Sequence, residues 1–536
     1  MAKTLNDKEA IPLKSDKKGA AKTISFMAVL ILLAKFMGLF REMLVANIYG
    51  QGMQSDIINT ATNIPLLFFD MVLGVAILST FVPIFNKYLE NFGKQRAMDF
   101  ANNFVSIVGT IALLVAVVGV VFAEPIVKIM VPGYADVPTK LEQTAKILRI
   151  LFPSIAFTAI AYVAVGMLQS FGEFTIPSLI SVVSNGVMIL YLMIFGNKLG
   201  LVGVAISMLV AWSLQLFVQL PKLYKFGYRY KPKFDLKESG IKEAALIALP
   251  VLISSWVQPL CNVINMSFGS NLGDGAVSAL NWANKIYIIM VGVFAYAITN
   301  FVFPKLSRLS GDNDKEAFAQ TTRTAVGWIV FIIMLISALF LALSKPIISV
   351  VFERGAFTSE STAVTANALF YYSFGMVGYA ICEVLNKSFY AIQDGKTPMY
   401  TSIFGVVVNI SCAVLFIKVL KMNIGGLALA SAISSVAIAI SLLFMINKRR
   451  KGIITKMFLI NIFKTVIMGV LAFLVAKFIY GGIENINIFG DGMIETLIKL
   501  CISAIPAMIM YILAAFVLKA DEVKVLANKI HKGGDN

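Results

Sequence analysis

Apolar stretches of similar length alternate with short polar breaks along almost the whole chain. Four of these stretches, residues 104–123, 325–344, 401–417 and 427–446, contain no ionisable residue. A helix needs roughly 20 apolar residues to cross ~30 Å of hydrocarbon. Inside lipid a single segment pairs its own backbone N–H and C=O groups only as a helix. The pattern therefore predicts an all-α polytopic membrane protein.

The apolar runs predict about fourteen transmembrane helices. They begin near residues 24, 57, 104, 145, 176, 201, 244, 276, 325, 363, 399, 424, 457 and 494. Loops that follow the second, sixth, eighth and twelfth runs are rich in Lys and Arg, and most connections on the other side are short or acidic. Because basic loops stay in the cytoplasm, we expect both termini to be cytoplasmic.

Two halves of the chain resemble each other at an offset of roughly 220 residues. The segments that start at residues 81, 124, 173 and 200 match those that start at 301, 345, 395 and 424. Two parallel six-helix repeats are typical of transporters that bind substrate at the seam between lobes, near the bilayer midplane. The predicted order is a cytoplasmic tail (1–22), an N-lobe (23–226), a basic cytoplasmic linker (227–243), a C-lobe (244–450), two further helices (451–519) and a cytoplasmic tail (520–536).

Composition narrows the class of function. Net charge is +17, with 58% hydrophobic and 14% charged residues, and basic loops explain this charge better than a nucleic-acid surface does. The four cysteines form no CxxC pair, and the one histidine, His531, lies in the polar tail. With no intramembrane histidine and scattered carboxylates, we expect no enzyme activity and no resident cofactor. No GxxxxGK[ST] motif is present, so direct use of ATP is not expected.

Charged residues inside apolar helices are the candidate functional groups, because a buried charge at the bilayer centre normally faces a cavity or a partner. Lys35 and Glu42 share one helical stripe, with Arg41 about 100° away from Glu42. Lys285 stands in the eighth helix. Together Lys35, Arg41 and Lys285 predict a cationic cavity for an anionic head group such as a phosphate or pyrophosphate. Alternatively, Lys35 extends to the membrane surface, and Arg41 and Glu42 neutralise each other.

Further charges have two interpretations each. Asp56 and Asp70 lie fourteen residues apart, nearly on one face of the second helix, but Asp56 also fits an N-cap after a Gly-rich turn. Glu383 and Lys387 are an i,i+4 pair, which is as consistent with a structural ion pair as with coupling or gating.

Motifs along the chain match one known family. The N-terminal segment "MGLFREMLVANIYGQGMQSDIINTATNIPLLFFDMVLGVAILSTFVPIF" resembles the start of the MurJ (MviN) lipid II flippases of the MOP exporter superfamily. Further matches are "LNWANKIYIIMVGVFAYAITNFVFPKLS", "VVFERGAFTSEST" and "SFYAIQDGKTP". The resemblance covers essentially the whole chain.

This resemblance implies a fourteen-helix inner-membrane protein, V-shaped in the arrangement of its lobes, that moves lipid II from the inner to the outer leaflet. It implies that Arg41, with Glu42 beside it, Asp56 and Lys285 are functional positions, and that Lys35 is a further basic one. Lysine stands at 285 and 35 where arginine is common, so a bidentate phosphate contact would be lost there.

Two other family features map less directly onto this sequence. A family arginine in the second helix falls at Phe69, next to Asp70. Some members bind sodium in the C-lobe, for which Glu383 and Asn386 are candidates, so a monovalent cation such as Na+ is the one ion to expect.

Two alternative functions are also consistent with parts of the sequence. A MATE-type cation-coupled multidrug exporter needs only twelve helices and an acidic cavity, and export of another lipid-linked polysaccharide is also consistent with the chain. Expected partners are lipid II and membrane lipids, and the basic loops could recruit cell-wall synthesis proteins. Transport would draw on an ion gradient or the membrane potential, worth ~2.3 kcal/mol per charge per 100 mV.

Overall fold

The structure is a computed structural model that describes residues 17–255, 257–311, 314–486, 490 and 492–523. Within these ranges the chain is almost entirely helical and forms no strand. The expected all-α class is therefore confirmed.

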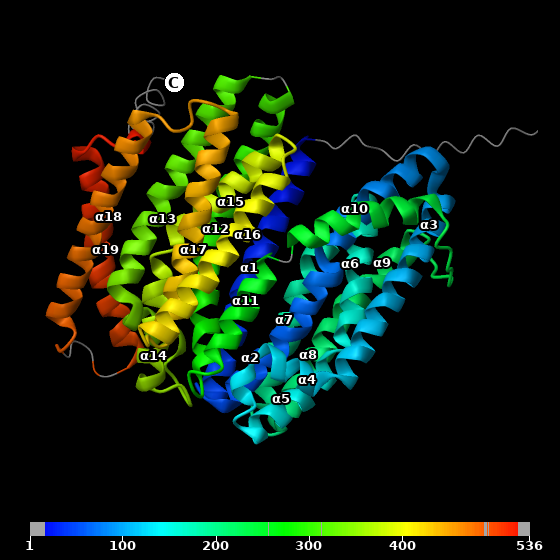
Figure 1. The fold of residues 1–536 in the computed structure, drawn as a ribbon, viewed down its shortest axis with the longest axis horizontal. Helices are drawn as coiled ribbons and strands as arrows, with labels where there is room; N and C mark the ends of the chain where they lie inside the picture. Colours follow the sequence, from blue (N-terminus) through cyan, green and yellow to red (C-terminus); the bar gives the residue numbers. More distant parts are fainter. Residues whose placement is uncertain (1–16, 256, 312–313, 487–489, 491, 524–536) are drawn as a thin grey trace, which may run out of the picture.

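The first lobe contains the N-terminal helices (Figure 1). They are α1 (Lys17–Tyr49), α2 (Met53–Phe69), the π-helical turn η1 (Asp70–Gly74), α3 (Val75–Val121), α4 (Ala123–Met130), the 3-10 turn η2 (Pro132–Tyr134), α5 (Pro138–Leu151), α6 (Ser154–Ser170), α7 (Thr175–Phe195), α8 (Gly200–Phe217) and α9 (Leu220–Lys225). Gly93 interrupts α3 with φ 79°, a conformation that glycine adopts without steric cost. The segments of α3 before and after this glycine run in opposite directions (Figure 1).

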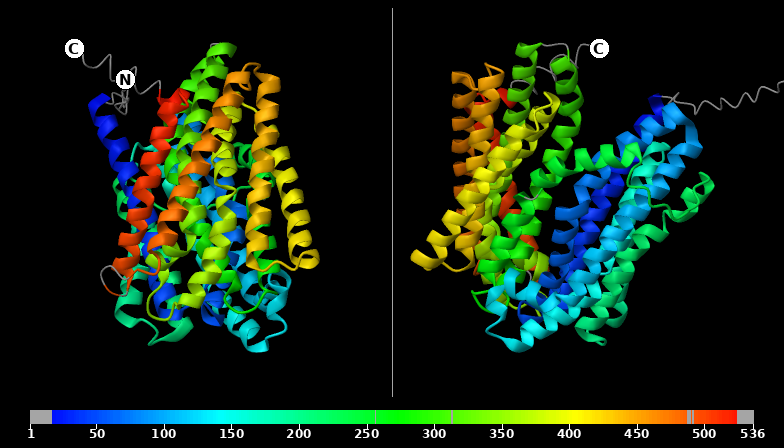
Figure 2. Two further views of the ribbon diagram at one scale, coloured as in Figure 1. Left: turned by 90° about the vertical axis from the view of Figure 1, so that its left-hand side faces the viewer. Right: turned by 45° about the vertical axis from the view of Figure 1, so that its right-hand side comes forward.

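The second lobe contains α11 to α17, and two more helices lie on its outer flank (Figures 1 and 2). Its members are α11 (Val257–Gly269), α12 (Ala276–Gly311), α13 (Lys315–Phe352), α14 (Ser359–Ser373), α15 (Met376–Ala391), α16 (Lys396–Val414), the π-helical turn η3 (Leu415–Val419) and α17 (Ile424–Arg449). The flanking helices α18 (Lys456–Ile483) and α19 (Met493–Val517) pack on each other and on α13.

The helix α10 (Ser239–Ser255) packs against α3 in the first lobe, although its continuation α11 belongs to the second. The basic connection between α9 and α10 is hydrogen-bonded to α3. Asn103 Nδ2 donates to Asp235 O, and Asp235 N donates to Asn103 Oδ1. Lys231 N donates to Asn102 Oδ1. The last residues of the expected 227–243 linker are therefore helical, and α10 is a bridge between lobes.

The expected count of fourteen spans is not established. In the described part of the chain, ten helices are long and apolar enough to cross a membrane, or eleven if the bent pair α14–α15 is one span. The helix α1, which contains Lys35, Arg41 and Glu42, is not among these ten. The helices α2, α10 and α11 are shorter than these spans, and they also lie among the helices of the two lobes (Figure 1).

Helix boundaries repeat at the spacing that the sequence showed. The starts of α2 and α12 (53 and 276), of α5 and α14 (138 and 359) and of α7 and α16 (175 and 396) are each about 220 residues apart. The same corner is also built twice. Glu173 accepts from the backbone N of Thr175 at the start of α7, and Asp394 does so from Thr397 at the start of α16.

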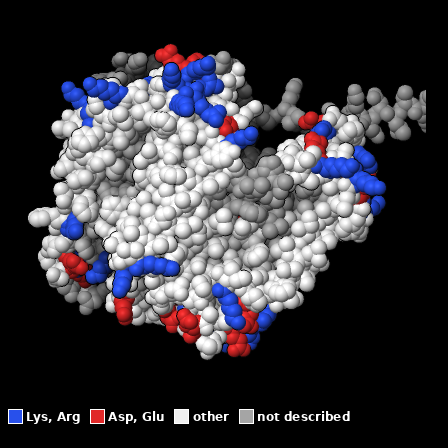
Figure 3. Space-filling model, viewed as in Figure 1, with Lys and Arg blue, Asp and Glu red and all other residues white. Residues whose placement is uncertain are grey.

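The two lobes meet at one end and diverge toward the other, where α1 begins (Figures 1 and 2). At the joined end Ala356 N donates to Asn47 O at 2.8 Å. Gly50 packs against the backbone of Ala356 in the other lobe, and Gly355 packs against the backbone of Asn47. On the face in Figure 3, Lys and Arg predominate at the divergent end, both signs mix at the joined end, and a broad uncharged band separates them. This distribution is typical of a protein that spans a bilayer.

Candidate functional site

Three of the predicted residues form one cluster at the seam between lobes. Glu42 on α1 lies 2.7 Å from Arg41 NH2 and, through the same oxygen, 2.7 Å from Lys285 Nζ on α12. The second Glu42 oxygen accepts a hydrogen bond from Trp282 Nε1 at 3.2 Å. Arg41 NH1 donates to Asn185 Oδ1 on α7 at 3.0 Å. Two cations thus share one carboxylate, which leaves the cluster with a formal charge of +1.

The cluster is part of an antiparallel contact between α1 and α12. Glu42 faces Lys285, and the Lys35 ammonium lies close to Gly292, seven residues along each helix in opposite directions. Seven residues of helix rise about 10 Å, so Lys35 is two turns nearer the divergent end. The side chain of Lys285 is 33% exposed and that of Arg41 19%, whereas Glu42 is 8% exposed. The cations are therefore more accessible than the anion that pairs them.

Lys285 also lines a cavity of about 280 Å³ between the lobes. Asp70 lies on its opposite wall, on the π-helical turn η1 that interrupts the α2–α3 helix. The remaining polar lining consists of five amide side chains and one hydroxyl, those of Asn63, Asn262, Asn265, Asn281, Asn284 and Tyr372. Single π-helical turns in otherwise regular helices are frequent at functional sites. Phe69 packs edge-on against Tyr162 inside the N-lobe.

Asp56 lies at the joined end and is fully buried. Its carboxylate accepts bonds from Gly275 N at 2.9 Å and from Ser278 N and Oγ at 2.8 Å, at the start of α12. The start of α2 instead has Ser55 bonded to Gly52. The N-cap interpretation was therefore wrong about the helix concerned, because Asp56 stabilises the N-terminus of α12 in the other lobe.

Lys140 on α5 is the functional candidate that the sequence reasoning missed. Its Nζ lies 2.7 Å from Asp56 Oδ2 and 2.7 Å from Asp274 Oδ1, and its side chain is 2% exposed. The Tyr134 ring covers the ammonium at 4.2 Å. In the sequence Lys140 looks like a loop lysine after "YADVPT", and in the structure it lies in the first turn of α5, so no pattern in the sequence distinguishes it.

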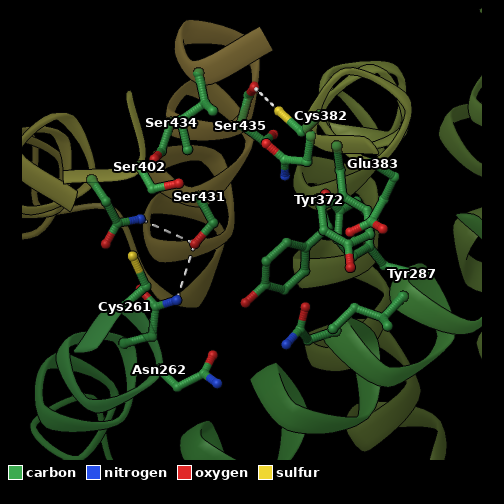
Figure 4. A pocket seen from close by; sticks show the side chains of 17 residues that line it. Cys261, Asn262, Tyr287, Tyr372, Cys382, Glu383, Ser402, Ser431, Ser434 and Ser435 are labelled. Carbon is green, nitrogen blue, oxygen red and sulfur yellow. Dashed lines mark hydrogen bonds between the residues drawn. The ribbon is translucent and has the colours of Figure 1, made fainter. Parts of the chain in front are cut away.

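A second polar pocket, of about 160 Å³, lies inside the C-lobe (Figure 4). Glu383 and Asn386 line this pocket. The Glu383 carboxylate is hydrogen-bonded to Tyr379, and it lies close enough to Lys387 and Lys35 to interact with them electrostatically. Figure 4 shows Ser431 receiving hydrogen bonds from two amides, those of Asn265 (3.0 Å) and Asn409 (3.2 Å).

Three amide oxygens in this pocket lack donors. The Oδ1 atoms of Asn265, Asn386 and Asn409 are buried and accept no hydrogen bond from the described residues. Lys387 lies apart, with its ammonium 5.8 Å from the centre of the Phe303 ring. The structure thus brings together Arg41, Glu42 and Lys285, with Asp70 in the cavity that Lys285 lines and Lys35 two turns away. Glu383 and Asn386 share the C-lobe pocket, whereas Asp56 lies at the joined end.

Comparison with known proteins decides the family. The family profile described as "Lipid II flippase MurJ" matches residues 45–500. The chain belongs to the MurJ lipid II flippase family. A probable lipid II flippase MurJ of Rhizobium meliloti (strain 1021) is 29% identical over 408 residues, covering 75% of this chain and 76% of the relative. One from Buchnera aphidicola subsp. Schizaphis graminum is 26% identical over 384 residues, 71% and 75% of the two chains.

Solved structures agree with the MurJ fold. "Lipid II flippase MurJ, inward closed conformation" superimposes with a TM-score of 0.78 at 24% identity, covering 93% of this chain and 99% of that one. An inward-facing multidrug resistance MATE family transporter of the MOP superfamily gives 0.64 at 16% identity, with 80% and 98% covered. The MATE fold is thus related, and the MurJ fold includes more of this chain.

Proposed function

We propose that this protein carries lipid II across the bacterial inner membrane by alternating access, with both termini in the cytoplasm, and binds the pyrophosphate at Arg41 and Lys285. The observation that carries the proposal is the link from Arg41 through Glu42 to Lys285, which joins the two lobes through partly exposed cations. A pyrophosphate would compete with the Glu42 carboxylate for these two cations, Arg41 and Lys285. Arg41 offers it a bidentate fork, and Lys285 a point charge.

Binding at this position affects the lobes as well as the ligand. An anion that takes over Lys285 removes the Glu42–Lys285 contact and replaces it with contacts from one head group to α1 and α12. Such differential contacts are what allow a ligand to shift a conformational equilibrium. Lys35, nearer the divergent end, is the first of the three cations that a head group meets from that side. The cavity amides then hydrogen-bond the sugar and peptide.

The test replaces the cations one at a time. Arg41→Ala and Lys285→Ala should each abolish rescue of a strain depleted of its own MurJ, with normal protein levels in the membrane, while Lys285→Arg should rescue. In the failing strains lipid II should accumulate in the inner leaflet. Full rescue by both alanine variants would reject the assignment. The matched control is Lys87→Ala, which removes a cation from an exposed pair with Glu243.

We further propose that a monovalent cation such as Na+ couples to transport in the C-lobe pocket. Carbonyl oxygens suit hard cations, and three buried amide oxygens there have no donor among the described residues. No group of three or more His, Cys, Asp or Glu that could hold a metal was found among those residues, which favours a monovalent ion. Asn409→Ala should remove the sodium dependence of lipid II flipping in proteoliposomes, and unchanged dependence would refute the site.

The MATE-type alternative makes a different demand. A cavity for cationic drugs should present net negative charge at the seam, whereas Arg41, Glu42 and Lys285 together carry +1.

We also propose that the basic 227–243 segment contacts cell-wall synthesis proteins. Crosslinking from a photoreactive residue at Lys231, which is exposed, tests this contact.

A further inference from the structure

A pocket of about 410 Å³ lies where α13, α18 and the chain after α19 meet, far from the seam. Both acidic and basic groups line it, with Arg323 and Trp328 on α13, Asn461 on α18, and Asp521 and Glu522 after α19. Neither the lipid II site nor the sodium proposal uses any of these residues.

Glu522 is a buried carboxylate without an ion-pair partner in the described chain. It is 5% exposed, and both its oxygens accept from Asn461 Nδ2 at 2.9 Å. No Lys or Arg of the described residues lies within 4.0 Å of it. The fold also reserves space for this group, since a Cβ at Gly327 would lie 2.7 Å from Glu522 Oε1. Buried charges are normally paired, so the pocket favours a cationic ligand.

Arg323 supplies the opposite charge in the same pocket. Its NH1 donates to Gly452 O at 3.1 Å and to Thr455 Oγ1 at 3.5 Å. Its other guanidinium nitrogens have no acceptor among the described residues. A fork of free N–H donors is the group that binds phosphate oxygens best. One cavity therefore presents separate sites for a cation and for a phosphate.

The pocket is at the level of the lipid head groups. The charge-free stretch of α13 begins at residue 325, so Arg323 lies just outside it and Trp328 just inside, as aromatic residues do at membrane interfaces. A second, mostly apolar groove of about 570 Å³ between α12 and α13 shares Trp328 with the polar pocket. An apolar chain attached to a head group in the pocket can lie in this groove.

We propose that this pocket binds an aminophospholipid such as phosphatidylethanolamine, with its ammonium on Glu522 and its phosphodiester on Arg323. An anionic phospholipid would place its uncompensated charge beside two carboxylates, Asp521 and Glu522. A quaternary choline lacks the N–H donors that a buried carboxylate needs as hydrogen-bond partners. The site thus distinguishes lipids by the head-group amine.

The experiment measures lipid binding to the purified full-length protein by native mass spectrometry, with phosphatidylethanolamine, phosphatidylcholine and phosphatidylglycerol of identical acyl chains. The wild type should bind phosphatidylethanolamine about tenfold more tightly than either of the others. Glu522→Gln should remove that preference, since a neutral amide keeps the shape but not the charge. Arg323→Gln should weaken phosphatidylethanolamine by a similar factor.

Control variants are Glu316→Gln and Arg96→Gln, which change exposed groups outside the pocket and should leave all three affinities unchanged. Equal affinity for the three lipids, a preference for phosphatidylglycerol, or an unchanged preference in Glu522→Gln would each overturn the proposal. If Glu522→Gln does not fold, the wild-type preference and the Arg323→Gln result decide the matter.

Discussion

Lys140 and Asp56 form a buried ion pair, 2.7 Å between Nζ and Oδ2, at the point where the lobes meet. The same ammonium binds Asp274, and the same carboxylate holds the backbone of Ser278, both in the other lobe. The joined end is thus closed by one connected set of charge-assisted bonds. A transporter that opens alternately must break this set to open there.

Removing Lys140 should destabilise the joined end strongly. Lys140→Ala leaves Asp56 buried without its cation, and loss of one partner of a buried pair costs about 3–5 kcal/mol. We expect a lower thermal unfolding temperature in detergent and, by spin-label distances across the joined end, a larger fraction of separated lobes. Lys128→Ala is the control, because its pair with Glu124 on neighbouring α4 is exposed and is worth no more than about 1 kcal/mol. Equal effects of the two variants would contradict the role of Lys140.

Gly355→Ala should separate the same end by steric contact. A Cβ there would overlap Asn47 Oδ1 and lie 2.5 Å from the backbone oxygen of Asn47, and that backbone cannot yield without moving a lobe. Gly172→Ala is a matched control, since its φ of +77° is also positive but nothing lies within 4 Å. Both changes carry about 1–2 kcal/mol of left-handed strain. Gly355→Ala should cost about 1–3 kcal/mol more, measured as thermal stability. A difference of zero between the two variants would refute the close contact.

Trp282→Phe tests how Glu42 is held. The change keeps an aromatic ring against Phe352 and Phe357 and removes only the Nε1 donor to Glu42. Loss of one hydrogen bond to a charged group is worth about 1.5–3 kcal/mol. We expect lipid II flipping to fall about tenfold, with near-normal protein levels. Trp328→Phe, outside the seam, should leave the flipping rate unchanged, and a wild-type rate for Trp282→Phe would show that Glu42 needs no such support.

The corner at Asp394 predicts an acid-dependent loss of stability. Burial alone would raise the pKa of Asp394, but bonds from Thr397, Arg449 and Lys396 outweigh it and hold the pKa below 3.8. A carboxylate with a depressed pKa stabilises the fold fully above its unfolded pKa and loses that contribution as pH falls through the folded one. The stability difference between wild type and Asp394→Asn should therefore be constant from pH 7 to about 5 and shrink below pH 4.

A repeat-related control accompanies this measurement. The pKa of Glu173 is also lowered, because its bonds to Lys222, Thr175 and Ile176 outweigh burial, so Glu173→Gln should show the same dependence on pH. Glu360→Gln, an exposed change in the first turn of α14, should give a small difference from wild type at every pH. A difference for Asp394→Asn that persists at pH 3 would contradict the assigned pKa direction.

Much of the fold could be predicted because apolar length and loop charge are local properties of the sequence. The repeat offset of about 220 residues reappears in the helix starts. The placement of α10 could not be predicted. Its packing on α3 depends on the Asn102 and Asn103 contacts with a loop more than 120 residues away, and no periodicity records a contact of that kind.

The site was predictable in part for the same reason. Arg41, Glu42 and Lys285 stand out because charge is rare in an apolar helix. Lys140 and Asn185 do not, since a lysine near a loop and an asparagine in a helix are ordinary until the fold shows what they touch. That Asp56 caps a helix of the other lobe was equally hidden, because it depends on how the lobes dock.

The duplicated corner at Glu173 and Asp394 has a mechanical consequence. Each acid ties the start of one helix to a basic residue at the end of the following hairpin, Lys222 in one lobe and Arg449 in the other. Such ion pairs stiffen the corner at which each acid lies, so we expect bending there to contribute little to transport. We therefore expect the two halves to move as rigid bodies, with the rearrangement confined to the contacts between them.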